Sequence, residues 1–227
     1  MKSKILPFLL TVFALFGLTG CFELEEKAHF NKDGSGNYQF TIDLAQLGSF
    51  INMMEAMDSN KGEEEASPKD EIKKGFEESK SELANIKGIS NVTPIEDEEN
   101  FRFGFSFDFK DIDALNAGMN KIFDVKEDGE PVDMTFFSFK RGRLERFEHQ
   151  DMVGMLNKAS ENGKVEIDGG AFMKDFRFTT IYTFEEPIKN VSNQEVMLSP
   201  DRKTVTNSVQ PFNTEDEHLS LQNTIDF

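Results

Sequence analysis

The sequence is poor in the residues that most often carry chemistry. Its 227 residues include one cysteine, three histidines, two tyrosines and no tryptophan. A single cysteine cannot form an internal disulfide, and His29, His149 and His218 show neither the HExxH nor the HxH spacing of a metal site. Carbohydrate-binding surfaces stack sugars on Trp or Tyr, so the scarcity of both disfavours glycan binding. We therefore expect no cofactor, no metal site and no catalytic residue.

Basic residues are also scarce. Asp and Glu number 42 against 25 Lys and Arg, which gives a formal net charge of −17. The first twenty residues carry Lys2 and Lys4 and no acid, so the remainder has a charge near −19. Nucleic acid needs Lys and Arg to neutralise its phosphates, so we expect no nucleic acid partner. Basic proteins or divalent cations would be attracted, although an acidic surface also simply keeps an exported protein soluble.

The N-terminus contains an apolar run that is too short for a permanent membrane span. Ile5 to Leu18 is apolar apart from Thr11 but has only 14 residues, whereas about 20 are needed to cross the hydrocarbon core. Preceded by two lysines, the run has the size and charge of a signal-peptide core. It ends in a sequence that resembles the bacterial lipobox, with a bulky aliphatic residue, two small residues and a cysteine: Leu18-Thr19-Gly20-Cys21.

The resemblance to lipoprotein precursors implies a role for Cys21 as the site of lipid attachment. The signal peptide would be cut before it, and its thiol would carry diacylglycerol, with a further acyl chain such as palmitate in Gram-negative cells. Two or three chains hold a protein stably on a membrane, whereas one holds it only marginally. Alternatively, the cysteine stands by chance behind a secretory signal, or the segment is an uncleaved anchor.

The residues after the cysteine bear on which membrane is used. Residue 22 is Phe rather than the Asp that retains many enterobacterial lipoproteins in the inner membrane, so the outer membrane is favoured where the cell has one. Glu23, Glu25 and Glu26 loosely resemble acidic surface-export signals. The periplasmic and surface leaflets therefore both stay open.

The rest of the chain has the patterning of a folded domain. It holds most of the 24 Phe residues, many of them at alternating positions, which is enough for a substantial core. We expect a signal peptide at 1–20 and an α+β lipoprotein domain at 21–186 with a flexible acidic loop at 58–67. A β-rich C-terminal extension at 187–227 is expected to continue the main domain.

Predicted strands and helices alternate along this domain. Period-2 runs on both sides of the turn from Asn31 to Gly36 predict a β-hairpin, and Phe101 to Phe109 alternates without a break. Helical spacing of apolar residues predicts helices at 44–57, 68–87, 111–123 and 151–160. Further strands are predicted at 92–95, 134–139, 144–147, 172–184, 195–198, 204–209 and 218–225. This rhythm predicts an α+β fold, with a mostly antiparallel sheet built from β-hairpins alternating with helices packed on one face, and a β-rich end.

One loop is superficially similar to a calcium-binding loop. Aligning Gly34 with the glycine of such a loop places His29 at its first position and Phe40 at its twelfth, where acids are required. The segment from Asn31 to Gly36 is therefore predicted to be a turn.

Candidates for catalysis are equally weak. Ser35 lies in Gly34-Ser35-Gly36, which lacks the G-x-S-x-G spacing of a nucleophile elbow. Acid pairs such as Glu185 and Glu186 are expected by chance among 42 acids. A glycosidase would need two carboxylates that face each other across a cleft, and the sequence alone does not identify such a pair.

Two pieces of the chain resemble the LppM-type lipoprotein domain. One runs from Cys21 through Asp33-Gly34-Ser35-Gly36 into the second strand, and the other comprises 184–191 and 204–207. Together they cover less than a fifth of the chain. The resemblance implies a lipidated α+β domain of the cell envelope without established catalytic residues, and it transfers no site.

These features together predict a membrane-anchored cell-envelope lipoprotein that acts as a non-catalytic binding or structural module, with an envelope protein as its expected partner. Two alternatives stay open. The Phe stripes could line a pocket, making the protein a carrier of a lipid or small hydrophobic ligand, or they could form an ordinary core. Facing carboxylates could make it a hydrolase.

Overall fold

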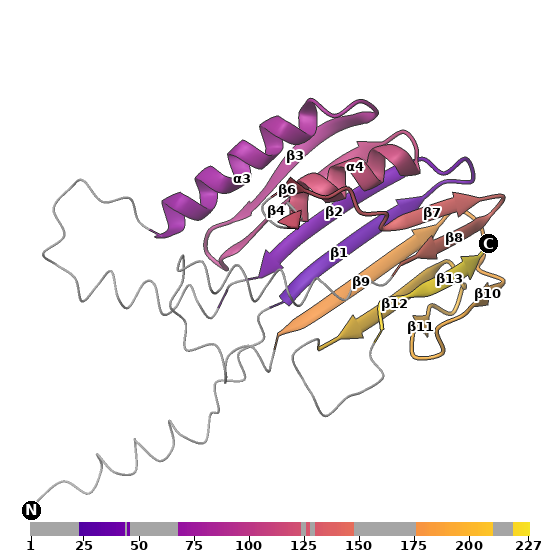
Figure 1. The fold of residues 1–227 in the computed structure, drawn as a ribbon. Coiled ribbons are helices and arrows are strands. Elements are labelled where there is room, and N and C mark those ends of the chain that lie inside the picture. The colour runs from indigo at the N-terminus through magenta and orange to yellow at the C-terminus, as the bar shows by residue number, and fades with distance from the viewer. Residues whose placement is uncertain are drawn as a thin grey trace, which may run out of the picture.

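The computed structural model describes residues 23–43, 45, 68–123, 126–127, 130–147, 176–210 and 220–227. Several predicted features lie outside these residues: the signal peptide with Cys21, the acidic loop at 58–67 and the helices at 44–57 and 151–160. Figure 1 shows that the described residues form a large twisted sheet, a smaller sheet and two helices.

The larger sheet has seven strands in the order β11–β12–β9–β1–β2–β4–β3. Its neighbouring strands are antiparallel except for β1 and β9, which pair in parallel at the middle of the sheet. The strands are β1 (Glu23–Phe30), β2 (Gly36–Asp43), β3 (Ile89–Asp97), β4 (Arg102–Phe109), β9 (Arg177–Phe184), β11 (Met197–Leu198) and β12 (Thr204–Val209).

The smaller sheet has four strands in the order β10–β13–β8–β7, all antiparallel. Its strands are β7 (Phe137–Lys140), β8 (Arg143–Arg146), β10 (Asn190–Val191) and β13 (Asn223–Asp226). Two further short strands, β5 (Lys126–Glu127) and β6 (Glu130–Pro131), pair with each other.

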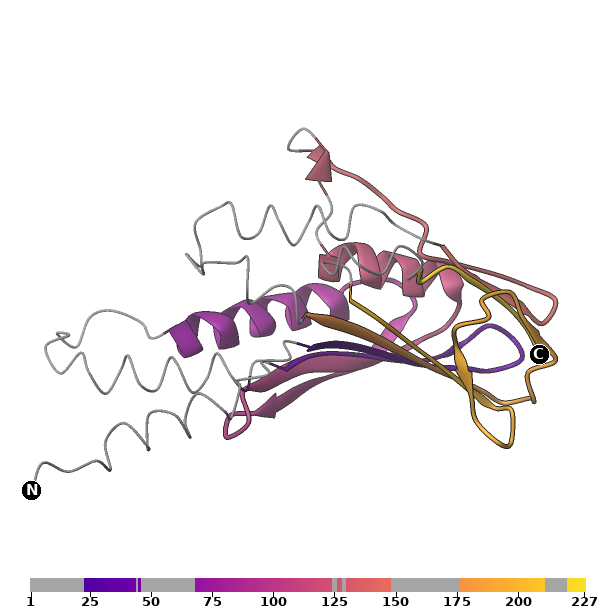
Figure 2. The ribbon, with the colours of Figure 1, turned by 90° about the horizontal axis from the view of Figure 1, so that it is seen from below.

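The two described helices are α3 (Pro68–Ala84) and α4 (Ile112–Phe123). Figure 2 shows both on the same side of the seven-stranded sheet. Asp111 begins α4 as predicted, because its Oδ1 accepts a hydrogen bond from the Ala114 backbone N–H at 2.9 Å. The Oδ1 of Asn116 accepts from the backbone N–H groups of Phe136 and Phe137 at 3.0 and 2.9 Å, which holds the start of β7 against α4.

The core lies between the inner face of the seven-stranded sheet and the layer formed by the helices and the smaller sheet. Alternate residues of each long strand point into it, and Phe103, Phe105, Phe107 and Phe109 of β4 are all buried. The ring of Phe30 lies 5.8 Å from that of Phe109 and 5.5 Å from that of Phe184, between centroids. In the described residues the Phe stripes are thus packed core.

The predicted fold class is wrong. The protein is mostly sheet, with a mixed seven-stranded sheet and a separate four-stranded sheet, rather than a mostly antiparallel sheet of hairpins alternating with helices. Alternation in sequence reports which face of a strand is buried, but it does not report the partner of the strand. The parallel contact of β1 with β9 and the division of the strands between two sheets both depend on distant partners.

Several local predictions are confirmed. β1 and β2 form the predicted antiparallel hairpin, and Gly34 in its turn has a φ of 86°, which glycine adopts without steric cost. The hairpin of β7 and β8 and the helix after Asp111 are also present. The predicted strand at 92–95 extends over Ile89–Asp97.

Candidate functional site

The first strand of the fold starts directly after the predicted lipid site. In the sequence only Phe22 separates Cys21 from β1. The strand register places Glu23 level with Asp43 on β2 and Arg177 on β9, so these residues share one end of the sheet. We call this the Glu23 end. The opposite end, level with Phe30, is the Phe30 end.

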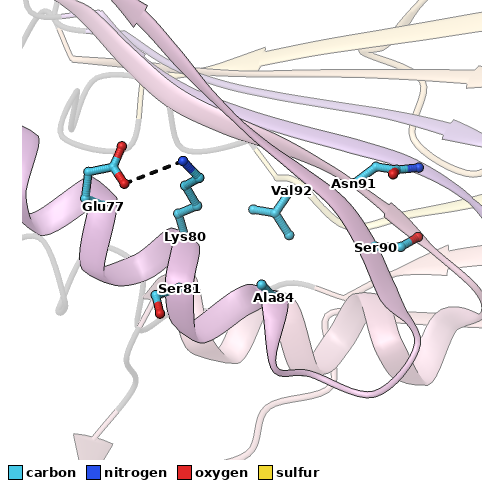
Figure 3. Close-up of a pocket in the computed structure, with 7 residues that line it drawn as sticks. All are labelled: Glu77, Lys80, Ser81, Ala84, Ser90, Asn91 and Val92. Atoms are coloured by element: carbon cyan, nitrogen blue, oxygen red, sulfur yellow. Dashed lines mark ion pairs between the residues drawn. The ribbon is translucent and has the colours of Figure 1, made fainter.

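A groove lies between α3 and the edge strand β3 (Figure 3). Its volume is about 300 Å³. Ala84, Val92 and the stem of Lys80 form its apolar part, while serines and a carboxylate add polar groups. The residues that line it are Glu77, Lys80, Ser81 and Ala84 of α3 and Ser90, Asn91 and Val92 of β3.

A bulge in β3 shapes this groove. The β3–β4 register shifts between Ser90 and Thr93, so Asn91 and Val92 together face the single residue Phe107 of β4. Asn91 has a left-handed φ of 54°, a conformation that Asn tolerates better than most residues. Its side-chain amide donates to Asp108 Oδ2 at 2.7 Å, which lowers the pKa of Asp108 and fixes the bulge on β4.

Charges around the groove are largely paired. Glu77, Glu78 and Glu82 of α3 each lie close to a lysine ammonium, and the acids from Glu96 to Glu99 lie at the other end of β3, level with the Glu23 end. The nearby ion pairs are weak because they are exposed: Lys80 Nζ lies 3.5 Å from Glu77 Oε2 and Lys74 Nζ lies 3.9 Å from Glu78 Oε1. The two charged residues that line the groove, Glu77 and Lys80, therefore balance each other.

A buried polar network lies in the core between the two sheets. Glu26 of β1 and Arg146 of β8 are essentially inaccessible, at 0% and 1% exposure, and their Oε2 and Nη2 atoms are 3.5 Å apart. Tyr182 of β9 joins them, because its hydroxyl donates to Glu26 Oε1 and accepts from Arg146 Nε at 3.1 Å. The guanidinium also lies over the Phe137 ring, 5.0 Å from its centroid.

Burial perturbs the titration of this network. Removal from water raises the pKa of Tyr38 and of Tyr182 well above the usual tyrosine range, and the Glu26 carboxylate raises both further. Burial alone would lower the pKa of Arg146, but the neighbouring Glu26 and Tyr182 more than offset this effect and raise it.

Three atoms of the network lack a hydrogen bond among the described residues: Glu26 Oε2, the Tyr38 hydroxyl and Arg146 Nη2. The charges of Glu26 and Arg146 attract each other, but their closest atoms lack hydrogen-bonding geometry. The network was not predicted from the sequence. Its one local signal was Glu26, the acid that interrupts an otherwise apolar face of β1.

A second surface hollow, of about 390 Å³, lies between the loop after β10 and the segment before β13. Asn223 Oδ1 accepts from the backbone N–H groups of Ser192 and Asn193 at 3.2 and 3.1 Å. Asn193 in turn donates to the carbonyl of Ser220 at 3.0 Å. These amides hold the loop in place, so the polar groups here serve the local structure.

Residues Asn31 to Gly36 form a turn between β1 and β2, as predicted. Asp33 Oδ1 accepts from the backbone N–H of Ser35 at 3.0 Å and from its hydroxyl at 2.6 Å, and these bonds lower the pKa of Asp33. The Ser35 hydroxyl is thus held by Asp33 and, at 3.0 Å, by the Asn31 amide. Neither contact activates it as a nucleophile.

The paired acids are held by cations or lie on opposite faces. Lys32 Nζ is 2.6 Å from Glu186 Oε1, which lowers the pKa of Glu186, and the Lys32 backbone N–H donates to Glu185 at 3.1 Å. Glu25 contacts Arg102 at 2.6 Å on the outer face of the sheet, whereas Glu26 points into the core. These pairs do not form two carboxylates facing each other across a cleft.

The described residues contain no group of three or more His, Cys, Asp or Glu side chains arranged to hold a metal ion. None of the described helices has the length and apolarity of a membrane span. His29 is exposed on the outer face of β1, whereas His149 and His218 lie outside the described residues.

No family model matches the sequence, and no curated protein matches it either. Among solved structures, the chain is similar to the folded domain of the LppM protein of Mycobacterium tuberculosis, determined by NMR, with 9% sequence identity and a TM-score of 0.42. The alignment covers 90% of this chain and 87% of that domain.

Proposed function

We propose that this chain is a cell-envelope lipoprotein, anchored by lipid on Cys21, and that its folded domain is a non-catalytic module that binds an envelope protein. One observation carries the proposal. The lipobox Leu18-Thr19-Gly20-Cys21 is followed, after the single residue Phe22, by β1 at the middle of the main sheet.

A tether this short would set the orientation of the domain. With lipid on Cys21, the Glu23 end would face the membrane and the Phe30 end would face away from it. The strands are about 3.3 Å per residue, so β1 would carry the Phe30 end about 23 Å outward. The acids of the Glu23 end do not favour contact with anionic headgroups. The lipid on Cys21, rather than the protein surface, would therefore hold the domain to the membrane.

Phe22, in place of the Asp that retains many enterobacterial lipoproteins in the inner membrane, favours the outer membrane where the cell has one. The partner is proposed to be a protein because the chain is acidic, with a formal net charge of −17, and because its surface offers a groove between α3 and β3.

The anchor is tested by labelling cells with a palmitate analogue that carries an alkyne. We expect the wild-type chain to take up label and to fractionate with membranes, and the Cys21→Ala variant to lose both properties while keeping its fold. Unlabelled wild-type protein would rule out the anchor.

The binding role is tested by purifying the full-length protein from its native membrane in mild detergent and identifying what accompanies it by mass spectrometry. A stoichiometric envelope protein, absent from a mock purification, is expected. A co-purified lipid with no protein would favour the carrier alternative and count against the proposal.

A further inference from the structure

We infer that a basic corner at the Phe30 end of the domain binds a short acidic segment of a partner protein. This inference rests on the proposed function, for which it names a contact surface and the chemistry of the partner. The basic corner consists of exposed cations from three segments: Lys140, Arg141 and Arg143 around the turn between β7 and β8, Lys189 before β10, and Arg202 before β12.

Hydrogen bonds join these three segments into one surface. Arg143 is opposite Asp226 in the register of β8 and β13, and the backbone N–H of Lys189 donates to the Asp226 carbonyl at 2.7 Å. The Arg202 guanidinium donates to the carbonyls of Ile188 and Lys189, at 2.8 and 3.1 Å. The turn between β7 and β8 is therefore held beside the segments that carry Lys189 and Arg202.

The basic corner lies at the Phe30 end of the sheet. The ring of Phe227 is 4.5 Å from that of Phe184 and 5.9 Å from that of Phe139, between centroids. Phe184 is level with Phe30, and Phe139 directly precedes Lys140. Figure 1 shows the β7–β8 turn, β10 and the C-terminus together at the end where the β1–β2 hairpin turns. In the proposed orientation this end faces away from the membrane.

The acids close to the corner are already matched by cations. Asp226 contacts Arg143 at 2.7 Å. Glu185 and Glu186 are matched by two lysines outside the corner, of which one lies 2.6 Å from Glu186 and the other donates to the Glu185 carbonyl at 2.9 Å. Asp201 directly precedes a cation of the corner. The corner therefore keeps an excess of positive charge, in a chain whose formal net charge is −17.

Two cations of the corner carry most of this excess. Lys140 and Arg141 are exposed at the hairpin turn, and neither forms an ion pair with another described residue. Arg202, by contrast, is held by backbone carbonyls. Lys140 and Arg141 are therefore the side chains that are available to an anionic partner.

The backbone at Arg141 also points to a role for its side chain. Lys140 and Arg143 are opposite residues, so Arg141 and Gly142 alone make the turn, with φ values of 52° and 75°. A turn of this kind favours Asn or Gly at its first position, because the Cβ of other residues crowds the following carbonyl oxygen. Arginine is thus strained here, and strain of this kind is typical of positions that serve binding.

The occupant follows from the contrast between the corner and the rest of the chain. A long polyanion would extend beyond the corner and meet the negative charge of the remaining surface, whereas a short acidic segment would meet only the cations. Lipid headgroups are disfavoured because the corner faces away from the membrane in the proposed orientation. A short acidic segment of an envelope protein is the partner that fits both constraints.

The test uses the full-length protein in detergent and a short fluorescent peptide in which Glu and Ser alternate. The matching Gln–Ser peptide is the control, and fluorescence anisotropy measures the affinity. We expect the Glu–Ser peptide to bind and the Gln–Ser peptide not to bind. The net charge of the chain repels an acidic peptide, so such binding requires a local basic surface. A Glu–Ser peptide that does not bind would overturn the inference.

Two arginines at opposite ends of the sheet provide a matched comparison. Arg141→Asn is expected to weaken peptide binding about two- to fivefold and to raise the melting temperature, because Asn tolerates the left-handed conformation. Arg177 is exposed at the Glu23 end, and Arg177→Asn should leave binding unchanged. Equal weakening by both variants would show only a general effect of charge and would overturn the inference.

A second probe distinguishes the class of partner. Long-chain polyphosphate carries the same sign of charge but cannot avoid the acidic remainder of the surface. We expect it to bind more weakly than the Glu–Ser peptide at equal concentration of charge. Tighter binding of polyphosphate would assign the corner to a phosphate polymer and overturn a protein as the partner.

The inference and the proposed function can fail independently. Unlabelled Cys21 with peptide binding that depends on Arg141 would refute the anchor alone. An envelope protein that co-purifies equally with the wild-type chain and with a Lys140→Gln/Arg141→Asn variant would support the proposed function and refute the basic corner as its site.

Discussion

Glu26 on β1 and Arg146 on β8 place opposite charges in the core, with Oε2 and Nη2 3.5 Å apart and neither side chain exposed to solvent. The two residues belong to different sheets, so their contact links the four-stranded sheet to the seven-stranded one. Such a pair costs desolvation energy and adds little net stability, but breaking it leaves a buried charge without a partner.

Single and double substitutions should separate these effects. Arg146→Met strands the Glu26 carboxylate in the core, so we expect the free energy of unfolding in urea to fall by about 3–5 kcal/mol. The Glu26→Leu/Arg146→Met double variant removes both charges and should be more stable than either single variant. Additive losses in the double variant would show that the charges do not interact.

An exposed ion pair gives the control for that experiment. Arg143 contacts Asp226 at 2.7 Å on the surface, where water and salt screen the attraction. Arg143→Met should therefore have a small effect compared with Arg146→Met.

The two tyrosines should resist ionisation in alkali. Tyr38 and Tyr182 are the only tyrosines and no tryptophan is present, so near-ultraviolet phenolate absorbance reports these two side chains alone. Burial, together with the Glu26 carboxylate, raises their pKa values well above the usual tyrosine value of about 10. We expect no phenolate absorbance until the protein unfolds.

Stability should follow the same titration. A raised pKa means that the folded state retains protons that the unfolded state releases. The stability that the two tyrosines contribute in this way is therefore fully present below about pH 10, and it is lost as the pH rises toward the pKa of the folded state. Urea unfolding across this range would measure it. Phenolate absorbance that appears near pH 10 in folded protein would contradict both expectations.

The two tyrosines should respond differently to removal of the hydroxyl. The Tyr38 hydroxyl has no hydrogen bond among the described residues, so Tyr38→Phe should change stability by less than about 1 kcal/mol. Tyr182 bonds to both Glu26 and Arg146, so Tyr182→Phe should cost about 1–3 kcal/mol. Thermal or urea unfolding of the two variants side by side checks the order, and the reverse order would contradict the described network.

Two glycines should respond in opposite directions to alanine. A Cβ on Gly75 of α3 would meet nothing within 4 Å, and Ala is the better helix former, so Gly75→Ala should stabilise by about 0.5–1 kcal/mol. A Cβ on Gly104 of β4 would lie 2.0 Å from the Phe40 carbonyl oxygen, so Gly104→Ala should prevent normal pairing of β2 with β4. Circular dichroism during heating would follow both variants, and unchanged melting of Gly104→Ala would contradict the described pairing.

Local patterns predicted individual elements well. Strict alternation identified β4, and a turn glycine between two alternating runs identified the hairpin of β1 and β2, because both signals lie within a few residues of the structure that they determine. The helix after Asp111 was equally visible from its cap and spacing.

Long-range pairing could not be predicted in the same way. Glu26 and Tyr182, which touch in the core, are 156 residues apart, and Arg146 lies in a different short strand, β8. The groove was missed because only the order of strands shows that β3 is an edge. Its residues, mainly Ser, Ala, Asn and Val, carry no sequence signal of binding.

The parallel pairing of β1 with β9 has a consequence for how the chain is delivered. The first strand of the fold completes its central contact only when residues 177–184 are available, and contacts so distant in sequence form slowly. An exported precursor of the kind proposed above must stay unfolded while it threads through an export channel. By joining its start to a segment near its end, this topology would delay the folding of such a precursor until nearly all of the polypeptide had crossed the membrane.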